Sequence, residues 1–166
     1  MPAKFIHLRV HTEFSLSKGL IRIKPLVKKL VADQIPAIAI TDQSNLCAAV
    51  KFYKSVRGAG VKPIIGVDVW LANEDEPEKP SCLTLLAMNN RGYLNITELV
   101  SKSFTAGQAF GKAIVEREWL VEASEGLIVL SGAKDGEVGR ALLAGRKEQA
   151  LERARFWMEV FPSSFY

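Results

Sequence analysis

The chain has 166 residues, of which 48% are hydrophobic and 24% charged, so its composition excludes wholesale disorder and collagen-like structure. No apolar run approaches the roughly 20 residues that a membrane-spanning helix needs, and the first residues lack the long apolar region of a secretory signal. The two cysteines, Cys47 and Cys82, are too few for a disulfide framework, and we interpret both as reduced thiols of a cytoplasmic protein.

The charge is unevenly distributed along the chain. The net charge is +4, but residues 1–62 hold 11 basic and 3 acidic residues, whereas residues 63–166 hold 11 and 15. A basic segment of this kind can contact nucleic acid or an acidic partner. The alternative is that these lysines lie solvated on ordinary helices and loops. We favour the alternative, because the lysines are scattered and no aromatic residues interleave with them.

Strands and helices are predicted to alternate along the first half of the chain. Apolar residues recur at helical spacing after Pro25, which suits a first helical turn, and the run Ala37–Thr41 is almost wholly apolar, as buried parallel strands are. Asn45 is a candidate cap for the following helix. The predicted elements are a strand at 5–10, a helix at 24–33, a strand at 37–41, a helix from 45 to about 57, a strand at 63–71 and a surface loop at 73–80.

The alternation continues in the second half. The predicted elements are a strand at 83–88, a helix at 91–104, a glycine- and alanine-rich loop at 105–114, a short helix at 116–123, a strand at 126–131 and helices near 136–143 and 147–160. Phe165 and Tyr166 look like the opening of a further strand, so we expect the chain to end inside a longer domain. Strands that alternate with helices indicate an α/β fold with parallel pairing.

Polar residues cluster at the carboxyl ends of the predicted strands. His11 follows the first strand, Asp42 follows the second and Asp68 lies within the third. Active sites of parallel α/β folds form where such strand ends converge, and imidazole and carboxylate groups suit a divalent metal. The alternatives are that Asp42 caps a turn and that His11 is an ordinary hydrogen-bonded histidine.

Five segments of the chain form an ordered set of motifs. They are His7–Ser15, Ala39–Asp42 with Asn45–Leu46, Pro63–Asp68, Leu85–Asn95 and Glu125–Gly132. The first three resemble the motifs of the polymerase and histidinol phosphatase (PHP) family. The last two are similar to stretches of one branch of that family, which forms the N-terminal domain of bacterial replicative DNA polymerase alpha subunits. Together they cover nearly the whole chain.

The resemblance implies a distorted (β/α)7 barrel with a metal centre at the carboxyl ends of its strands. Because the chain ends early, we expect an incomplete barrel, formed by residues 1–166 as a single truncated domain. The palm, thumb and fingers of a polymerase would lie outside it.

The resemblance also implies that the metal centre has degenerated. Among the positions that ligate metal in other members, His11 and Asp42 are intact, Asp68 replaces a glutamate and Cys82 replaces a histidine. Arg9, Gln43 and Ala133 cannot serve as ordinary ligands. We therefore predict a relic pocket in which Arg9 contacts Asp42 or Asp68 in place of a metal. Any residual metal would be held by His11, Asp42 and Asp68.

The function implied by the resemblance is that of a catalytically inert region of a replicative polymerase subunit. It would act as a scaffold and as a docking site for the proofreading exonuclease (epsilon) subunit, among other subunits of the polymerase III holoenzyme. No cofactor is expected here, whereas the parent polymerase would use Mg²⁺ and bind DNA. No contact with a membrane is expected. The alternative is a metal-dependent phosphoesterase, or an intrinsic 3′–5′ proofreading exonuclease, of the same family.

Overall fold

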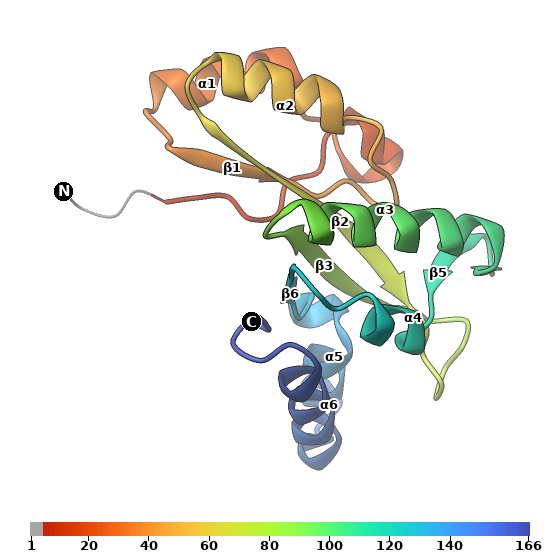
Figure 1. Cartoon of the computed structure of the whole chain (residues 1–166). Helices are drawn as coiled ribbons and strands as arrows, with labels where there is room; N and C mark the ends of the chain where they lie inside the picture. The colour runs from red at the N-terminus through yellow and green to blue at the C-terminus, as the bar shows by residue number, and fades with distance from the viewer. Residues whose placement is uncertain (1–4) are drawn as a thin grey trace. The chain divides into compact units, whose positions relative to one another are not determined.

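The computed structural model describes residues 5–166, which form two compact units, with the division between Val67 and Asp68. The strand β2 (Lys62–Leu71) begins in the first unit and ends in the second (Figure 1). Each unit has its own helices and buried side chains. That the chain forms a single domain, as its sequence leads us to expect, stays a prediction.

The first unit packs two helices against a short parallel pair of strands. Helices α1 (Ile23–Ala32) and α2 (Ala49–Gly58) lie beside strand β1 (Ala37–Ile40), as Figure 1 shows. Strand β1 pairs in parallel with the start of β2, so that Ala37 lies opposite Lys62. The core of this unit includes Ile23, Leu30, Ile38, Ile40, Phe52 and Val56, each at most 3% exposed. The predicted helix at 24–33 and the strand at 37–41 are confirmed.

Two predictions in the first unit are wrong. Residues 5–10 form no regular strand, but run beside β1 with a single parallel bridge between His7 and Ile38. The ladder does not continue, because the pairing slips by one residue: the Ala39 N–H donates to the His7 carbonyl oxygen, but the Thr41 N–H donates to that of Val10. Asn45 does not cap α2, which begins at Ala49; its side-chain amide instead donates to the carbonyl oxygens of Phe14 and Gln43.

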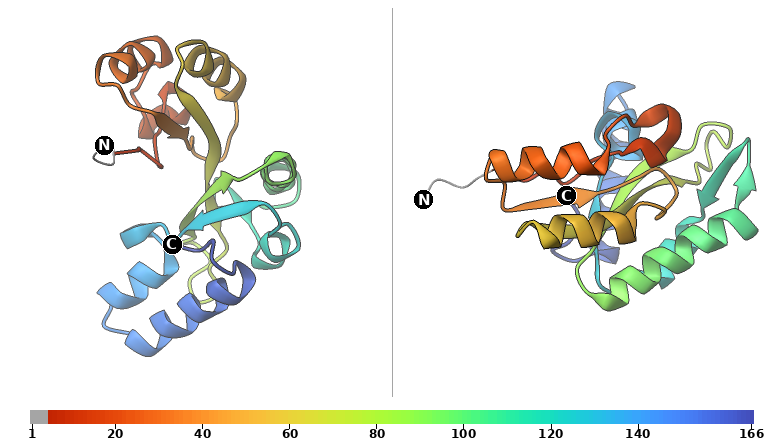
Figure 2. Two further views of the ribbon diagram at one scale, coloured as in Figure 1. Left: turned by 60° about the vertical axis from the view of Figure 1, so that its left-hand side comes forward. Right: turned by 90° about the horizontal axis from the view of Figure 1, so that it is seen from above.

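The second unit contains the end of β2 and the remaining strands. Their order is β4, β5, β2, β3, β6, and helices α5 and α6 lie side by side (Figure 2). The elements are β3 (Ser81–Ala87), α3 (Asn90–Thr105), β4 (Gln108–Ala109), β5 (Lys112–Val115), α4 (Arg117–Glu122), β6 (Leu127–Leu130), the 3-10 helix η2 (Ala133–Asp135), α5 (Glu137–Leu143) and α6 (Lys147–Val160).

The expectation of parallel pairing holds for β2 with β5 but fails for β3 with β6, which are antiparallel. A strand covered on both faces has the same apolar composition in either direction, so its sequence does not encode the pairing. The loop expected at 105–114 instead holds a small antiparallel hairpin, β4–β5. In its turn both central residues have positive φ, 52° at Phe110 and 70° at Gly111. Of the two, only the glycine is a residue type that indicates such a turn from the sequence.

The last residues pair with β6, as the sequence suggests. Phe165 forms a parallel bridge with Val129, and the Ser131 N–H donates to the Tyr166 carbonyl oxygen at 2.7 Å. Over residues 5–166, no helix combines the length and the apolar character needed to cross a membrane.

Candidate functional site

Asp42 forms the centre of a hydrogen-bonded cluster in the first unit. It lies two residues after the end of β1 and is only 2% exposed. Its Oδ1 accepts hydrogen bonds from the Thr12 backbone N–H (2.6 Å) and from the Ser15 hydroxyl (2.5 Å). Its Oδ2 accepts a third from the Thr12 hydroxyl (2.7 Å). These donors replace the water that a carboxylate loses on burial, so the protein itself stabilises the charged group.

The segment at 12–21 is folded so that Thr12 and Ser15 reach Asp42. Thr12 caps the 3-10 helix η1 (Glu13–Lys18), because its hydroxyl oxygen accepts a hydrogen bond from the Phe14 N–H at 3.2 Å. The segment closes at Gly19, where an added Cβ would lie 2.1 Å from the Thr12 carbonyl oxygen. Asp42 therefore anchors this segment to the end of β1.

Arg9 and His11 lie just before this cluster. Arg9 is exposed and His11 is partly exposed. The hypothesis pairs Arg9 with either Asp42 or Asp68. The donors to the Asp42 carboxylate are Thr12 and Ser15, so Asp68 is the acid that the hypothesis leaves for Arg9. Asp68 belongs to the second unit, and that pairing stays a prediction.

Gln43, which the sequence predicts to be a departure from a metal-binding pattern, makes hydrogen bonds within the first unit. Its Oε1 accepts a hydrogen bond from the Lys18 ammonium at 3.0 Å, and its Nε2 donates to the Ser44 hydroxyl at 3.3 Å. The backbone N–H of Gln43 donates to the Ser15 hydroxyl oxygen. The Gln43 side chain therefore contacts the Lys18 ammonium and the Ser44 hydroxyl.

Asp68 is the centre of a separate cluster in the second unit. It lies on β2, is completely buried, and accepts a hydrogen bond from the Thr84 hydroxyl to Oδ1 at 2.5 Å. The Cys82 thiol donates to Oδ2 at a sulfur–oxygen distance of 3.8 Å. Cys82 and Thr84 are two residues apart on β3, so both side chains point to the same face of the strand. The structure thus brings together two of the predicted site residues, Asp68 and Cys82.

Ala133 lies on η2 and is exposed. The preceding Gly132 has φ 77°, and an added Cβ there would lie 2.0 Å from the Cys82 carbonyl oxygen. This turn therefore packs closely against the backbone of β3, but the methyl group of Ala133 offers no metal ligand.

The donor chemistry does not fit the metal centre that the family resemblance implies. Across residues 5–166, no group of three or more His, Cys, Asp or Glu side chains is placed to hold a metal ion. The carboxylates of Asp42 and Asp68 accept hydrogen bonds from hydroxyl, amide and thiol groups instead.

Sequence reasoning missed the hydroxyl residues Thr12, Ser15 and Thr84. Two of them lie within the opening motif, where a hydroxyl that follows a strand can bond a nearby carboxylate. Thr84 could have been found from its spacing of two residues from Cys82 on a predicted strand. For all three hydroxyl residues the partner carboxylate is 16 residues or more away in sequence, which is why the pairing itself was not visible.

A third polar cluster joins α5 and α6 within the second unit. Glu137 receives the Arg117 guanidinium at 2.7 Å and the Arg153 guanidinium at 3.2 Å, and it accepts a hydrogen bond from the indole N–H of Trp157. The side chains of Glu137, Arg117 and Arg153 are between 11% and 18% exposed. Arg117 also stacks against the ring of Trp157, with 5.2 Å to its centroid.

The same cluster ties the acidic loop at 73–80 to α6. Asp75 Oδ2 accepts hydrogen bonds from the Gln149 amide at 2.9 Å and from the Arg153 guanidinium at 3.1 Å. A hydrogen bond from Lys79 is the main reason why the pKa of Glu76 is lowered. A small polar pocket lies among these side chains. Because its acidic and basic groups pair with one another, we interpret the ion pairs and hydrogen bonds of this cluster as a structural strap that holds the loop and the helices together.

Comparison with known proteins gives matches to polymerase subunits. The chain is 56% identical over all 166 residues to the DNA polymerase III subunit alpha of Pseudomonas fluorescens, and 45% identical over 163 residues to that of Escherichia coli K12. The chain spans only 14% of the length of each of these relatives.

Among solved structures, a Bifidobacterium adolescentis protein described as a metal-dependent phosphoesterase aligns with a TM-score of 0.55 and 12% identity. The alignment covers 80% of this chain and 69% of that one. This likeness bears on the fold alone, and it agrees with an incomplete barrel of the PHP type. The PHP domain family matches residues 7–166, nearly the whole chain. The chain belongs to the PHP domain family.

Proposed function

We propose that this chain is the N-terminal PHP region of a replicative DNA polymerase alpha subunit, and that the region is catalytically inert. It serves the polymerase as a scaffold and as a docking site for the proofreading exonuclease. The observation that supports the absence of catalysis is the hydrogen bonding of the two buried carboxylates. Asp42 and Asp68 accept hydrogen bonds from Thr12, Ser15 and Thr84, where a metal-dependent hydrolase needs free ligands.

Two kinds of evidence support the polymerase assignment. Identities of 45–56% over the chain link it to polymerase III alpha subunits, and the family match covers the same residues. In this proposal, nucleotide addition, its Mg²⁺ and its DNA substrate belong to the parent subunit. Other holoenzyme subunits are expected to bind the same parent.

The alternative function is a metal-dependent phosphoesterase or an intrinsic proofreading exonuclease. Its support is the fold shared with the phosphoesterase-like neighbour. Against it stand Arg9, Gln43 and Ala133 at ligand positions. Losing even one outer-shell partner typically weakens a metal site about 10–100-fold, and here the ligands themselves are replaced.

The metal content of the purified chain tests the inert reading. After incubation with Zn²⁺ or Mn²⁺ and dialysis, we expect clearly substoichiometric metal by mass spectrometry, because residues 5–166 place no group of three or more His, Cys, Asp or Glu side chains to hold a metal ion. The same preparation is expected to degrade no single-stranded DNA above the level of an Asp42→Ala control. Retention of one equivalent of metal, or nuclease activity lost on that substitution, would favour the alternative.

Docking is tested by titrating the proofreading exonuclease, and separately its C-terminal segment, against this chain and against the complete alpha subunit. We expect the complete subunit to bind with a dissociation constant of about micromolar or below, the range of a specific subunit contact. If the complete subunit fails to bind, the docking role is wrong. Binding by the complete subunit but not by this chain would place the contact beyond Tyr166.

A further inference from the structure

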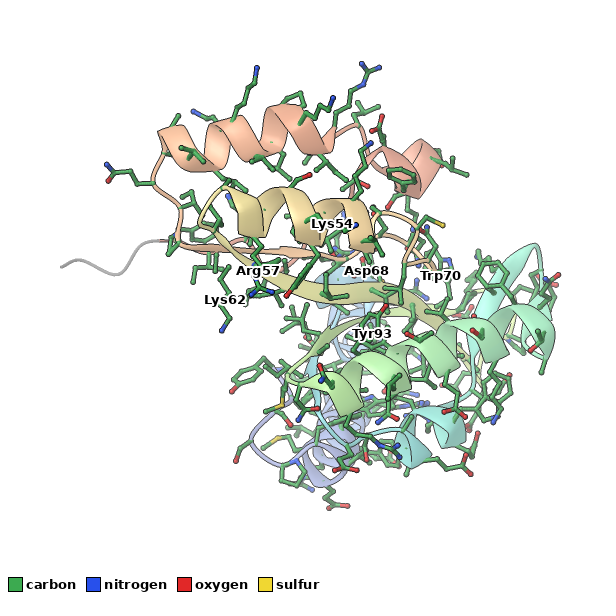
Figure 3. All side chains as sticks on the ribbon, turned by 45° about the horizontal axis from the view of Figure 1, so that its top comes forward. Lys54, Arg57, Lys62, Asp68, Trp70 and Tyr93 are labelled. Atoms are coloured by element: carbon green, nitrogen blue, oxygen red, sulfur yellow. The ribbon has the colours of Figure 1, made fainter. Side chains whose placement is uncertain are left out.

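The first unit has an excess of positive charge on α2 and at the start of β2. Lys51, Lys54 and Arg57 lie on α2 and Lys62 begins β2; all four are exposed. Residues 43–67 contain no aspartate or glutamate. Arg57 and Lys62 are joined by a tight turn, in which the Gly60 N–H donates to the Arg57 carbonyl oxygen at 3.0 Å. Figure 3 shows Lys54 and Arg57 on α2 and Lys62 on the strand that follows it.

The acids of this unit are engaged elsewhere. Glu13 pairs with Arg22 at 3.6 Å, Asp33 pairs with Lys29 at 3.0 Å, and Asp42 is buried against Thr12 and Ser15. Among residues 5–67, the charges of Lys54, Arg57 and Lys62 are therefore not neutralised by a carboxylate of the same unit. The surface formed by Lys54, Arg57, Lys62 and Tyr53 is called the α2 basic surface below.

An aromatic ring lies among these cations. Tyr53 is 41% exposed, and its hydroxyl accepts a hydrogen bond from Arg57 Nη1 at 2.6 Å. The Arg57 guanidinium carbon lies 5.6 Å from the centroid of the same ring. These contacts orient the ring, and Arg57 retains further N–H groups for an anion. The exposure of these lysines agrees with the sequence-based interpretation that they are solvated, but that interpretation took no account of the Tyr53 ring beside Arg57.

We propose that the α2 basic surface binds single-stranded nucleic acid. Lys54, Arg57 and Lys62 contact successive phosphates, and a base stacks on the exposed part of the Tyr53 ring. Exposed cations that are not paired with a carboxylate release counterions when they meet phosphates, and an aromatic ring beside them is the usual platform for an unpaired base. Two other ligands fit this surface less well. In a duplex the base faces are stacked inside and cannot reach the Tyr53 ring, and an acidic protein segment would use the cations but not the ring. The proposal concerns a ligand other than the exonuclease and does not depend on the docking role.

The test is the binding of a 20-nucleotide fluorescein-labelled oligo-dT to the chain, followed by fluorescence anisotropy between 50 and 200 mM salt. The variant Lys54→Gln/Arg57→Gln/Lys62→Gln is expected to lose about tenfold or more in affinity at 50 mM salt. The salt dependence, log K against log salt, should become shallower by about 2, since each phosphate contact contributes roughly 0.7 on single strands. Tyr53→Leu should lose about fivefold, whereas Tyr53→Phe, which keeps the ring, should recover most of that loss.

A matched control removes the same charge from the second unit. Lys134, Lys147 and Arg155 are exposed, and the variant Lys134→Gln/Lys147→Gln/Arg155→Gln is expected to bind within about twofold of the unmodified chain. Circular dichroism verifies that each variant is folded. Independently of any variant, photo-cross-linking of a bromodeoxyuridine strand to the unmodified chain should label the peptide that contains Tyr53.

Four results would overturn the proposal. They are no binding at 50 mM salt, equal losses in the two triple variants, tighter binding of duplex than of single strand, and a cross-link that maps away from α2. If Tyr53→Leu binds normally and poly-glutamate competes as well as oligo-dT, the surface is instead a site for an acidic protein.

Discussion

Glu137→Ala is expected to destabilise the second unit by about 3 kcal/mol or more. The substitution removes the acceptor of three donors from a cluster whose charged side chains are less than a fifth exposed. It leaves the Arg117 guanidinium largely buried without its nearest counter-charge, and this kind of loss typically costs about 3–5 kcal/mol. The measurement is urea unfolding followed by circular dichroism, with the midpoint and slope both reported.

A matched control separates this effect from the simple loss of an acid. Glu148 is exposed on α6, and Glu148→Ala is expected to change the free energy of unfolding by no more than about 0.5 kcal/mol. Glu137→Gln should fall between the two, because an amide keeps the shape and one acceptor but not the charge. If Glu137→Ala unfolds like the control, the cluster does not strap α5 to α6.

Asp42→Ala is the second substitution with a large expected effect. It removes a buried carboxylate and leaves the Thr12 N–H, the Thr12 hydroxyl and the Ser15 hydroxyl without their acceptor. Hydrogen bonds to a charged group contribute about 1.5–3 kcal/mol each, and the losses here are not additive. We expect a loss of about 3 kcal/mol in the free energy of unfolding, measured by urea titration.

The control for Asp42 is Asp33→Ala. Asp33 forms an exposed pair with Lys29, which is expected to contribute less than about 1 kcal/mol and to weaken further with salt. The relic-pocket reading also requires that the loss at Asp42 be the same with EDTA and with added Mn²⁺. A metal-dependent loss at Asp42 would instead identify this carboxylate as a working ligand.

The sequence by itself determined the family and many of the local elements, although it failed at residues 5–10 and at the β4–β5 hairpin. The helical spacing after Pro25 and the runs predicted as strands at 37–41 and 63–71 were sufficient for their elements, because those signals depend on neighbours within a few residues. The ordered motifs also predict that Arg9, Gln43 and Ala133 depart from a metal-binding pattern, and this stays a prediction.

Only the tertiary structure decided which groups meet. Thr12 and Ser15 reach Asp42 across 27 residues or more, and Thr84 reaches Asp68 across 16. Strand direction in the β3–β6 pair and the strap from Glu137 to Arg117 likewise depend on chain segments that are distant in sequence. Hydrogen bonds and ion pairs depend on the distance and the orientation of two groups in space. The local sequence around either group does not predict these when the groups are far apart in the chain.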